Sequence, residues 1–262
     1  MSGKKAKLSH KISLVMIVKN EEKFLPGCLE SVRNFVDEMV IVDTGSTDRT
    51  KEIAQSFGAK VYDFEWQYDF SAARNFALSK ATYSWILWLD ADERLPEIYH
   101  RGLKKIIASG KYDALVVKLR SEVNGPLGKT PHYQQSPRIF RLLPGVRFEY
   151  PVHEQITPSL IRAGARFVMV DVILEHLGYA QDEKVIEEKI HRNLNLLKKH
   201  LQLEPENAYA HYQMAQSLEL LDRVEEAIEH YHLAIKYDDD KKSISPTVYL
   251  HLAAIHIKNN EY

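Results

Sequence analysis

An apolar run that ends in acidic residues, at positions 83 to 93, constrains the fold of this chain more than any other segment. Its residues are nearly continuously apolar from Trp85 to Leu89, which favours a strand of a parallel sheet that is covered on both faces. Asp90 and Asp92 follow at the carboxyl end of that strand, where open α/β sheets bind their ligands. In an extended chain, side-chain alternation places both carboxylates on one face, within reach of one cation. An ordinary acidic turn after a buried strand is the alternative.

Strand and helix patterns alternate over the first 95 residues, which predicts a parallel sheet with right-handed crossovers. The predicted strands are Ile12–Val18, Met39–Val42, Lys60–Asp63 and the run from Trp85, and the predicted helices are Phe24–Phe35, Arg49–Phe57 and Ser71–Lys80. Short β-type runs at 114–119, 138–142 and 167–174 are expected to complete the sheet as mixed or antiparallel strands. The segment Asn124–Gln135 is rich in Gly, Pro and polar residues, which predicts a mobile loop.

Beyond Asp182 the periodicity is helical throughout. A long helix is predicted at Glu183–Leu203 and a helix–turn–helix at Ala208–Asp238, whose apolar residues have the register of a tetratricopeptide repeat. A second repeat begins near Thr247 and stops after about half a unit. Because a lone repeat cannot bury its own apolar faces, we expect either a chain that is cut short or helices that dock on the first domain. The predicted organisation is therefore a flexible N-terminus at 1–10, an α/β domain at 11–181 and a helical region at 182–262.

The composition excludes several classes of function. The chain has 35 basic and 36 acidic residues, a balance that gives no reason to expect a nucleic-acid partner. Its single cysteine, Cys28, rules out an internal disulfide framework and a cysteine-based zinc site, and it fits a reducing cytoplasm. No apolar run of about 18 residues is present, so no transmembrane span is expected.

Four motifs, taken in order, resemble those of family-2 glycosyltransferases, which have the nucleotide-diphospho-sugar (GT-A) fold. They are Ile17–Glu21, Val40–Asp48, Asp69–Asn75 and Leu89–Glu93. The resemblance covers about residues 11 to 180. With the helical region included, the chain is similar to bacterial peptide S- and O-glycosyltransferases and to lipopolysaccharide-core glucosyltransferases. This resemblance implies an α/β fold with a Rossmann-like mixed sheet flanked by helices, followed by an all-α tetratricopeptide-like domain.

The resemblance also implies which residues bind a nucleotide-sugar donor. These are Asn20, Glu21, Asp43, Arg74, Asp90 and Ala91. Asn20, Glu21 and Asp43 would face the base and ribose, where carboxylates accept from N–H and hydroxyl groups. Arg74 would lie near the diphosphate. A turn former remains the alternative for Asp43, and a surface helix arginine remains the alternative for Arg74.

A divalent cation is the cofactor that the resemblance implies, with Asp92, Asp90 and His176 as its predicted ligands. The ion would neutralise the charge that develops on the leaving diphosphate. Mg²⁺ and Mn²⁺ both suit an oxygen-rich site, and an imidazole ligand favours Mn²⁺. A purely structural, hydrogen-bonded histidine is the alternative for His176.

An inverting transfer needs a base that takes the proton of the acceptor. Glu154 is our choice, with His153 as its orienter or substitute, although many family-2 enzymes use an aspartate in a Glu-Asp pair that this sequence lacks. A structural salt bridge is the alternative for Glu154. Arg138 and Arg141 are expected on one strand face, to meet a phosphate or an acceptor carboxylate, or else solvent.

Together these inferences predict a metal-dependent, inverting glycosyltransferase that uses a UDP-sugar, with UDP-glucose as first choice. The lead acceptor is a peptide Cys or Ser, and a cell-surface glycan or lipid-linked acceptor is the alternative. The helical repeats would present the acceptor or pair two copies into a homodimer. The rival from another class is a non-catalytic nucleotide-sugar fold that serves as a scaffold for protein interactions.

Overall fold

The structure, a computed structural model, describes residues 10–125, 128–177, 183–239 and 244–258. The chain divides into two compact units. Unit 1 comprises residues up to 67, 71–149 and 155–180, and unit 2 comprises 68–70, 150–154 and the residues from 181 onward. The predicted flexible N-terminus lies outside the described residues, except for its last residue.

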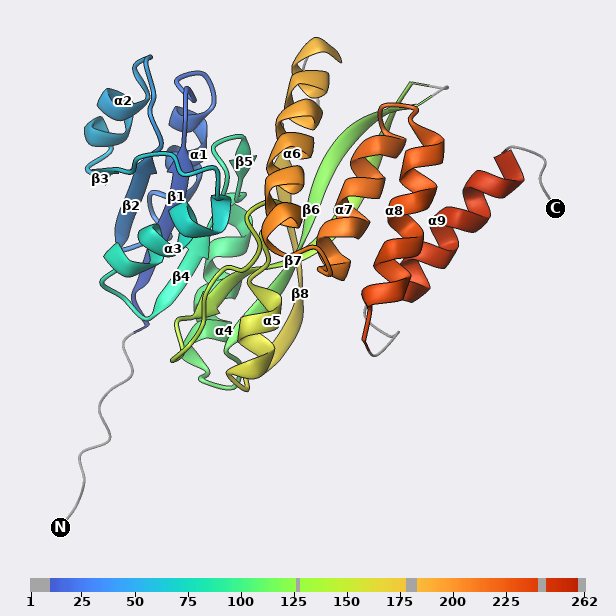
Figure 1. The fold of residues 1–262 in the computed structure, drawn as a ribbon. Helices are drawn as coiled ribbons and strands as arrows, with labels where there is room; N and C mark the ends of the chain where they lie inside the picture. Colours follow the sequence, from blue (N-terminus) through green and yellow to red (C-terminus); the bar gives the residue numbers. More distant parts are fainter. Residues whose placement is uncertain (1–9, 126–127, 178–182, 240–243, 259–262) are drawn as a thin grey trace. The chain divides into compact units, whose positions relative to one another are not determined.

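Within the described residues, unit 1 is built on an eight-stranded mixed sheet in the order β3-β2-β1-β4-β7-β6-β8-β5 (Figure 1). Its strands are β1 Ile12–Val18, β2 Glu38–Asp43, β3 Lys60–Asp63, β4 Trp85–Trp88, β5 Glu93–Arg94, β6 Ala114–Gly125, β7 Gly128–Arg141 and β8 Phe167–His176. Strands β1 to β4 pair in parallel. β7 pairs antiparallel with β4 and β6, β6 pairs parallel with β8, and β5 pairs antiparallel with β8. The predicted mixed sheet is confirmed.

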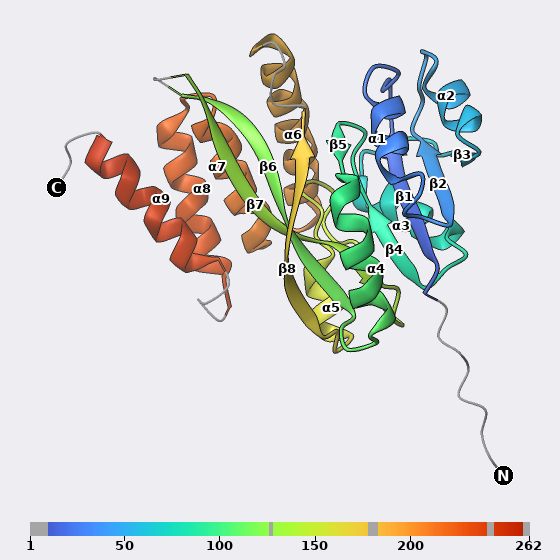
Figure 2. The same cartoon turned by 180° about the vertical axis from the view of Figure 1, so that it is seen from behind.

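Helices cover both faces of this sheet, which Figures 1 and 2 show from opposite sides. They are α1 Leu25–Val32, α2 Thr50–Ser56, α3 Phe70–Lys80, the 3₁₀ turn η1 Glu97–Tyr99, α4 His100–Ala108 and α5 Thr157–Arg162. One core holds residues of α1, α2 and α4 together with Leu14 of β1, and the other holds residues of α3 and α5 together with Val15. Successive residues of β1 thus serve opposite faces, which explains its nearly continuous apolar sequence.

The predicted mobile loop at Asn124–Gln135 is wrong, apart from residues 126–127, which lie outside the described part. These residues form the end of a long β6–β7 hairpin, whose register runs to Gly125 opposite Gly128. Pro131 lies inside the segment that was predicted as a loop and Pro137 just beyond it, and neither residue can donate to a ladder. Since β4 pairs with β7 only at 139–141, both prolines lie on an open edge, where that missing donor is tolerated.

The helices of unit 2 are α6 Glu183–Leu203, α7 Ala208–Glu219, α8 Val224–Tyr237 and α9 Ser245–Lys258. The predicted helix–turn–helix is confirmed as the α7–α8 pair. Asn207 caps α7, since its side chain accepts from the Ala210 N–H at 2.9 Å. Met214, Leu218 and Tyr231 are buried as their spacing predicted. That these helices form a tetratricopeptide repeat stays a prediction.

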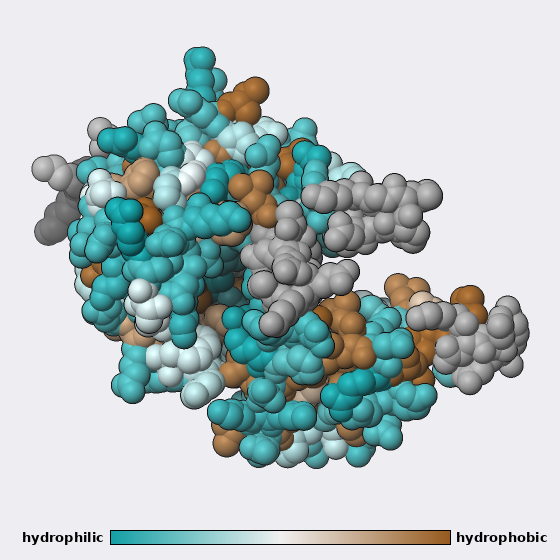
Figure 3. Space-filling view, turned by 90° about the horizontal axis from the view of Figure 1, so that it is seen from above, coloured by the Kyte–Doolittle hydropathy of each residue, from teal (hydrophilic) through white to brown (hydrophobic). Residues whose placement is uncertain are grey.

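The surface in Figure 3 is mostly hydrophilic, interrupted by groups of apolar residues. In unit 2, such exposed apolar side chains include Leu220 and, on α9, Tyr249 and Leu250. Among the described residues, no helix has both the length and the apolar character that crossing a bilayer requires.

Glu38 ties the amino ends of four strands together. Its Oε2 accepts from the Ser13 hydroxyl at 2.6 Å and from the Thr82 N–H at 2.8 Å. Its Oε1 accepts from Lys60 Nζ at 2.7 Å and from the Thr82 hydroxyl at 2.6 Å. Ser13 belongs to β1, Lys60 to β3, and Thr82 precedes β4. Burial opposes ionisation of this carboxyl, but the hydrogen bonds from Lys60, Ser13 and Thr82 outweigh it and lower the pKa of Glu38 to about 2.

We expect Glu38→Gln to lower the free energy of unfolding by about 1.5–3 kcal/mol at pH 7, because an amide cannot accept all these hydrogen bonds. The folded-state pKa lies below the ordinary value of 4.5. The stabilisation is therefore complete above about pH 4.5 and is lost as the pH falls toward 2. Urea unfolding of wild type and variant across this range measures the difference.

Glu30→Gln is the matched control, because Glu30 forms an ion pair with Arg33 in which both side chains are more than 60% exposed. It should change the free energy of unfolding by less than about 1 kcal/mol. A Glu38→Gln effect that does not vary with pH would contradict the assignment.

Candidate functional site

The segments that follow β1, β2 and β4 lie at one edge of unit 1, because these three strands pair in parallel. Residues 90–93, here called the acidic turn, follow β4. That strand ends at Trp88, and Ala91 and Asp92 are in a turn. The expectation of an extended chain with both carboxylates on one face is therefore wrong. Asp90 and Asp92 instead have different partners.

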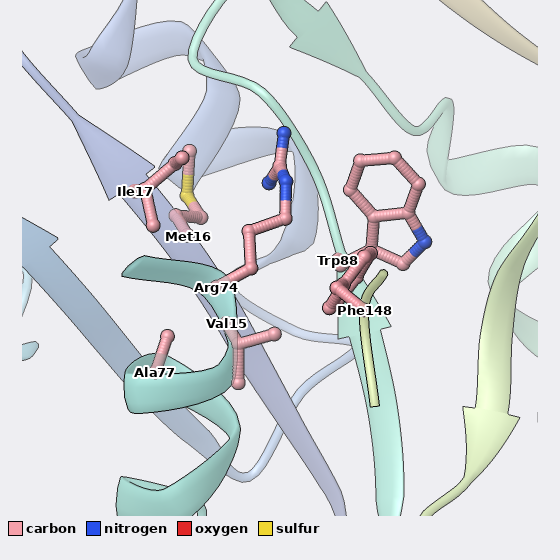
Figure 4. A pocket seen from close by; sticks show the side chains of 7 residues that line it. All are labelled: Val15, Met16, Ile17, Arg74, Ala77, Trp88 and Phe148. Carbon is pink, nitrogen blue, oxygen red and sulfur yellow. The ribbon is translucent and has the colours of Figure 1, made fainter. Parts of the chain in front are cut away.

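Asp90 pairs with Arg74. Arg74 Nη2 donates to Asp90 Oδ1 at 2.8 Å, and the guanidinium carbon lies 4.5 Å from the ring centre of Trp88. Figure 4 shows the Arg74 side chain between residues of β1 and Trp88, where it lines a small pocket. Burial opposes ionisation of Asp90, but attraction to Arg74 and Arg138 outweighs it, so the pKa of Asp90 lies below its ordinary value. Arg74 is buried, which rules out the alternative of a surface arginine.

Asp92 contacts His176, which was predicted as a ligand of the same cation. His176 Nε2 lies 3.2 Å from Asp92 Oδ2, and Nδ1 of the same ring lies 3.0 Å from the Ser121 hydroxyl. The β5–β8 pairing, which sets Glu93 opposite His176, brings the two together. Burial disfavours the charged imidazole, but the hydrogen bond with Asp92 outweighs it and raises the pKa of His176.

These side chains fit a divalent cation in their chemistry. Carboxylate oxygens with one imidazole suit Mn²⁺ or Mg²⁺, and the Ser121 contact orients the ring as the partners of metal-bound histidines do. Among the described residues, no three His, Cys, Asp or Glu side chains are already gathered around one point. The contact with Arg74 uses Asp90 Oδ1, and the Asp90 side chain is 40% exposed.

Glu93 and Arg138 form a buried ion pair beside the acidic residues. Arg138 Nη2 donates to Glu93 Oε1 at 2.7 Å, and the two side chains are 6% and 1% exposed. Burial, which attraction to Arg138 only partly offsets, raises the pKa of Glu93 to about 7. Sequence reasoning gave Glu93 no role, because Glu93 stands between Asp92 and Arg94 and nothing local indicates that it is buried.

The expectation that Arg138 and Arg141 share a strand face is wrong. Residues three apart on a strand point to opposite faces, and Arg141 pairs with Asp113 at 2.9 Å instead. Arg141 therefore does not belong to the group of side chains around the acidic turn.

Asp43, the last residue of β2, is buried, and only one of its two carboxylate oxygens has a hydrogen-bond partner among the described residues. Its Oδ2 accepts from the N–H groups of Gly45 at 3.0 Å and Ser46 at 2.9 Å, which bend the chain after the strand. Gly45 has a φ of 102°, a left-handed conformation that suits glycine. Asp43 Oδ1 has no hydrogen-bond partner among the described residues. The carboxylate thus serves as a turn former and still has an acceptor for a ligand hydroxyl.

Asn20 and Glu21 join the loop after β1 to the loop after β2. The Asn20 side chain accepts from the Thr47 N–H at 2.8 Å, and its own N–H donates to the Ser46 hydroxyl at 2.9 Å. The Glu21 N–H donates to the Thr50 hydroxyl at 2.7 Å. Asn20 therefore holds the two loops at this edge together.

The predicted base residues, His153 and Glu154, belong to unit 2. His153 has a left-handed backbone with a φ of 55°, and its carbonyl accepts from the Tyr209 hydroxyl at 3.1 Å. Burial lowers the pKa of His153, although Glu154 acts in the opposite direction. The neutral imidazole, which is the form able to take a proton, is thus favoured.

Arg94 fastens the acidic turn to α1. Its guanidinium donates to the carbonyls of Ala91 at 2.9 Å, Glu93 at 2.8 Å and Phe24 at 2.7 Å. Gly27 leaves the space for it, because a Cβ on Gly27 would lie 2.6 Å from Arg94 Nη2. Sequence reasoning missed this contact, since nothing local links residues so far apart.

We expect Gly27→Ala to lower the free energy of unfolding by about 1–3 kcal/mol, because the new methyl group displaces Arg94 from buried carbonyls. Gly102→Ala is the control. Gly102 is also helical, but nothing lies within 4 Å of a Cβ there, so alanine should stabilise by up to about 1 kcal/mol. Thermal and urea unfolding measure both, and equal effects would contradict the role of Gly27.

Comparison with known proteins links this arrangement to one family. The model of a family described as "Glycosyl transferase family 2" matches residues 13–173. The SPbeta prophage-derived glycosyltransferase SunS of Bacillus subtilis is 32% identical over 261 residues, which cover 96% of this chain and 60% of that protein. A TPR repeat-containing protein of Synechococcus elongatus is 38% identical over 204 residues, 76% of this chain and 50% of that one. The chain thus spans about half to three-fifths of the length of these curated relatives.

Solved structures with a similar fold include S. aureus TarS in complex with UDP. Its TM-score is 0.56 at 17% identity, over 93% of this chain and 87% of that one. Glucosyl-3-phosphoglycerate synthase from Mycobacterium tuberculosis, in complex with Mn²⁺, UDP and glucosyl-3-phosphoglycerate, has a TM-score of 0.52 at 18% identity, over 71% and 77% of the two chains. At these identities the likeness shows the fold alone.

Proposed function

Because the chain belongs to glycosyl transferase family 2, we propose that it transfers a sugar from a UDP-sugar to an acceptor, with a divalent cation at the acidic turn. One observation above all supports this proposal. Asp92, which contacts His176, and Asp90, which pairs with Arg74, both belong to the segment that follows β4, at the edge where open α/β sheets bind ligands.

Both negatively and positively charged side chains hold the donor. Asp92, Asp90 and His176 hold the cation, and Ser121 keeps the ring of His176 oriented. A bound Mn²⁺ or Mg²⁺ would neutralise charge that develops on the leaving diphosphate. Arg74, beside Asp90, is a guanidinium of the kind that binds phosphate oxygens in pairs.

The nucleoside is held by the loops after β1 and β2. Asp43 Oδ1, which is buried with no partner among the described residues, accepts from a ribose hydroxyl. Asn20 and Glu21 keep these loops together, and Ala91 lies with its backbone beside the donor. UDP-glucose is the donor we favour, because a relative in fold was crystallised with UDP, Mn²⁺ and a glucosylated product.

The acceptor is a peptide Cys or Ser in our lead hypothesis, and a cell-surface glycan or lipid-linked acceptor is the alternative. Glu154 takes its proton as the sugar is transferred with inversion, and His153 orients that carboxylate or replaces it. Unit 2 contains both residues, so its helices would present the acceptor, or pair two copies of the chain.

We expect Asp92→Asn to reduce Mn²⁺-dependent hydrolysis of UDP-glucose by at least about 10- to 100-fold, because it removes an anionic ligand of the cation. Release of UDP, measured with and without Mn²⁺, is the assay. Asp171→Asn is the control, because Asp171 lies on β8 with a side chain that is 91% exposed. If the wild-type protein shows no metal-dependent release, the chain is a scaffold and the proposed activity is wrong.

We expect Glu154→Gln to reduce sugar transfer by about 10²- to 10⁴-fold, the contribution of a general base, while the affinity for UDP stays unchanged. Mass spectrometry of candidate acceptor peptides measures transfer, and a thermal shift with UDP measures binding. His153→Gln is tested beside it. Normal transfer by Glu154→Gln together with a loss in His153→Gln would move the base to His153.

A further inference from the structure

We propose that Glu93 and Arg138 are positioning residues, which fix the acidic turn in the shape that binds cation and donor. The inference rests on the proposed function, because it names what sets the geometry of the same site. Neither residue is among the ligands or the base proposed above.

Glu93 holds Asp90 from both sides. Its Oε2 accepts from the Asp90 N–H at 3.0 Å, and its own N–H donates to the Asp90 carbonyl at 3.1 Å. These reciprocal hydrogen bonds close the turn and fix the backbone from which the Asp90 carboxylate extends. The side chain of Glu93 therefore determines where that carboxylate can lie.

Glu93 also sets the position of Asp92. In the β5–β8 register Glu93 lies opposite His176, and the Leu177 N–H donates to the Asp92 carbonyl at 2.9 Å. Asp92 is thereby held beside the imidazole that it contacts. One residue thus links the two carboxylates and the histidine that we propose as cation ligands.

Arg138 holds Glu93 in place. It donates to Glu93 Oε1 at 2.7 Å, and its guanidinium carbon lies 3.6 Å from the ring centre of Trp88. The indole N–H of Trp88 in turn donates to the Pro137 carbonyl at 2.9 Å, so the end of β4 is bound to β7. The acidic turn is anchored to a strand that lies far from it in the sequence.

The Glu93–Arg138 ion pair carries a cost in folding stability that a purely structural contact would not need. Arg138 Nε and Nη1 are buried with no hydrogen-bond partner among the described residues, and buried unpaired donors destabilise a fold. Apolar side chains of similar volume often fill such a place at least as well. What apolar side chains cannot supply is the acceptor for the Asp90 N–H, and this is the role that we infer.

Two double variants separate the acceptor from the ion pair. Glu93→Leu with Arg138→Met removes both, and Glu93→Gln with Arg138→Met keeps an oxygen that can accept from the Asp90 N–H. Both remove the two opposite charges together, so no unpaired charge stays buried. The Mn²⁺ concentration for half-maximal UDP-glucose hydrolysis is measured, and Mn²⁺ binding in the presence of UDP is followed by electron paramagnetic resonance.

The Leu–Met variant should raise the half-saturating Mn²⁺ concentration by about 10- to 100-fold, the usual effect of losing a residue that orients metal ligands. The Gln–Met variant should show a smaller rise. Arg141→Met is the control, because Arg141 lies on β7 like Arg138 but forms its ion pair with Asp113, away from the acidic turn. It should lower thermal stability and leave the Mn²⁺ dependence unchanged.

A folded Leu–Met variant with the Mn²⁺ dependence of the wild type would overturn the inference. If that variant does not fold, the Gln–Met variant decides, since an unchanged Mn²⁺ dependence there removes Arg138 from the role. Failure of the proposed function is distinguishable, because the wild-type protein would then show neither Mn²⁺ binding with UDP nor metal-dependent hydrolysis.

Discussion

Paired opposite charges at the end of β4, most of them buried, are the interaction on which the site depends. Two guanidinium groups, of Arg74 and Arg138, lie near the ring of Trp88 and pair with Asp90 and Glu93. Each charge is tolerable because an opposite charge lies within hydrogen-bond distance. Removal of one alone would leave its partner uncompensated in a poorly solvated place. Attraction to the guanidinium groups keeps the pKa of Asp90 below its ordinary value, whereas for Glu93 the attraction to Arg138 only partly offsets the effect of burial.

The parallel half of the sheet could be predicted because its strands are buried on both faces, which leaves a nearly continuous apolar signature. The β6–β7 hairpin could not. Its outer part is polar and contains Pro131 and Pro137, features that resemble a loop until the open edge is known. The helices α4 and α5 were also missed. Thr157–Arg162 has only six residues, so little of its periodicity stands out from the surrounding sequence. His100–Ala108 has nine, and the helical spacing of its buried Leu103 and Ile107 was overlooked.

Residue types at the site were easier to predict than their partners. The family resemblance identified Asp90, Asp92 and His176 as candidates, but Asp92 and His176 are 84 positions apart and meet only through the β5–β8 pairing. The two-residue strand β5 is too short to leave a pattern. For the same reason the ion pair between Glu93 and Arg138 was not predicted. The strand that contains Arg138 was expected, but not the residues with which it pairs. Partners that depend on long-range strand pairing are beyond local analysis.

Strand β2 carries a carboxylate at each end, Glu38 at its first residue and Asp43 at its last. Five residue steps separate them, about 17 Å of extended chain. The hydrogen-bond partners of Glu38 and those of Asp43 do not overlap. Substitutions at such separated sites, which share no partner, generally have additive effects. A substitution in the loop after Asp43 should thus leave the stabilisation around Glu38 intact, so the two ends of a single strand can be altered independently.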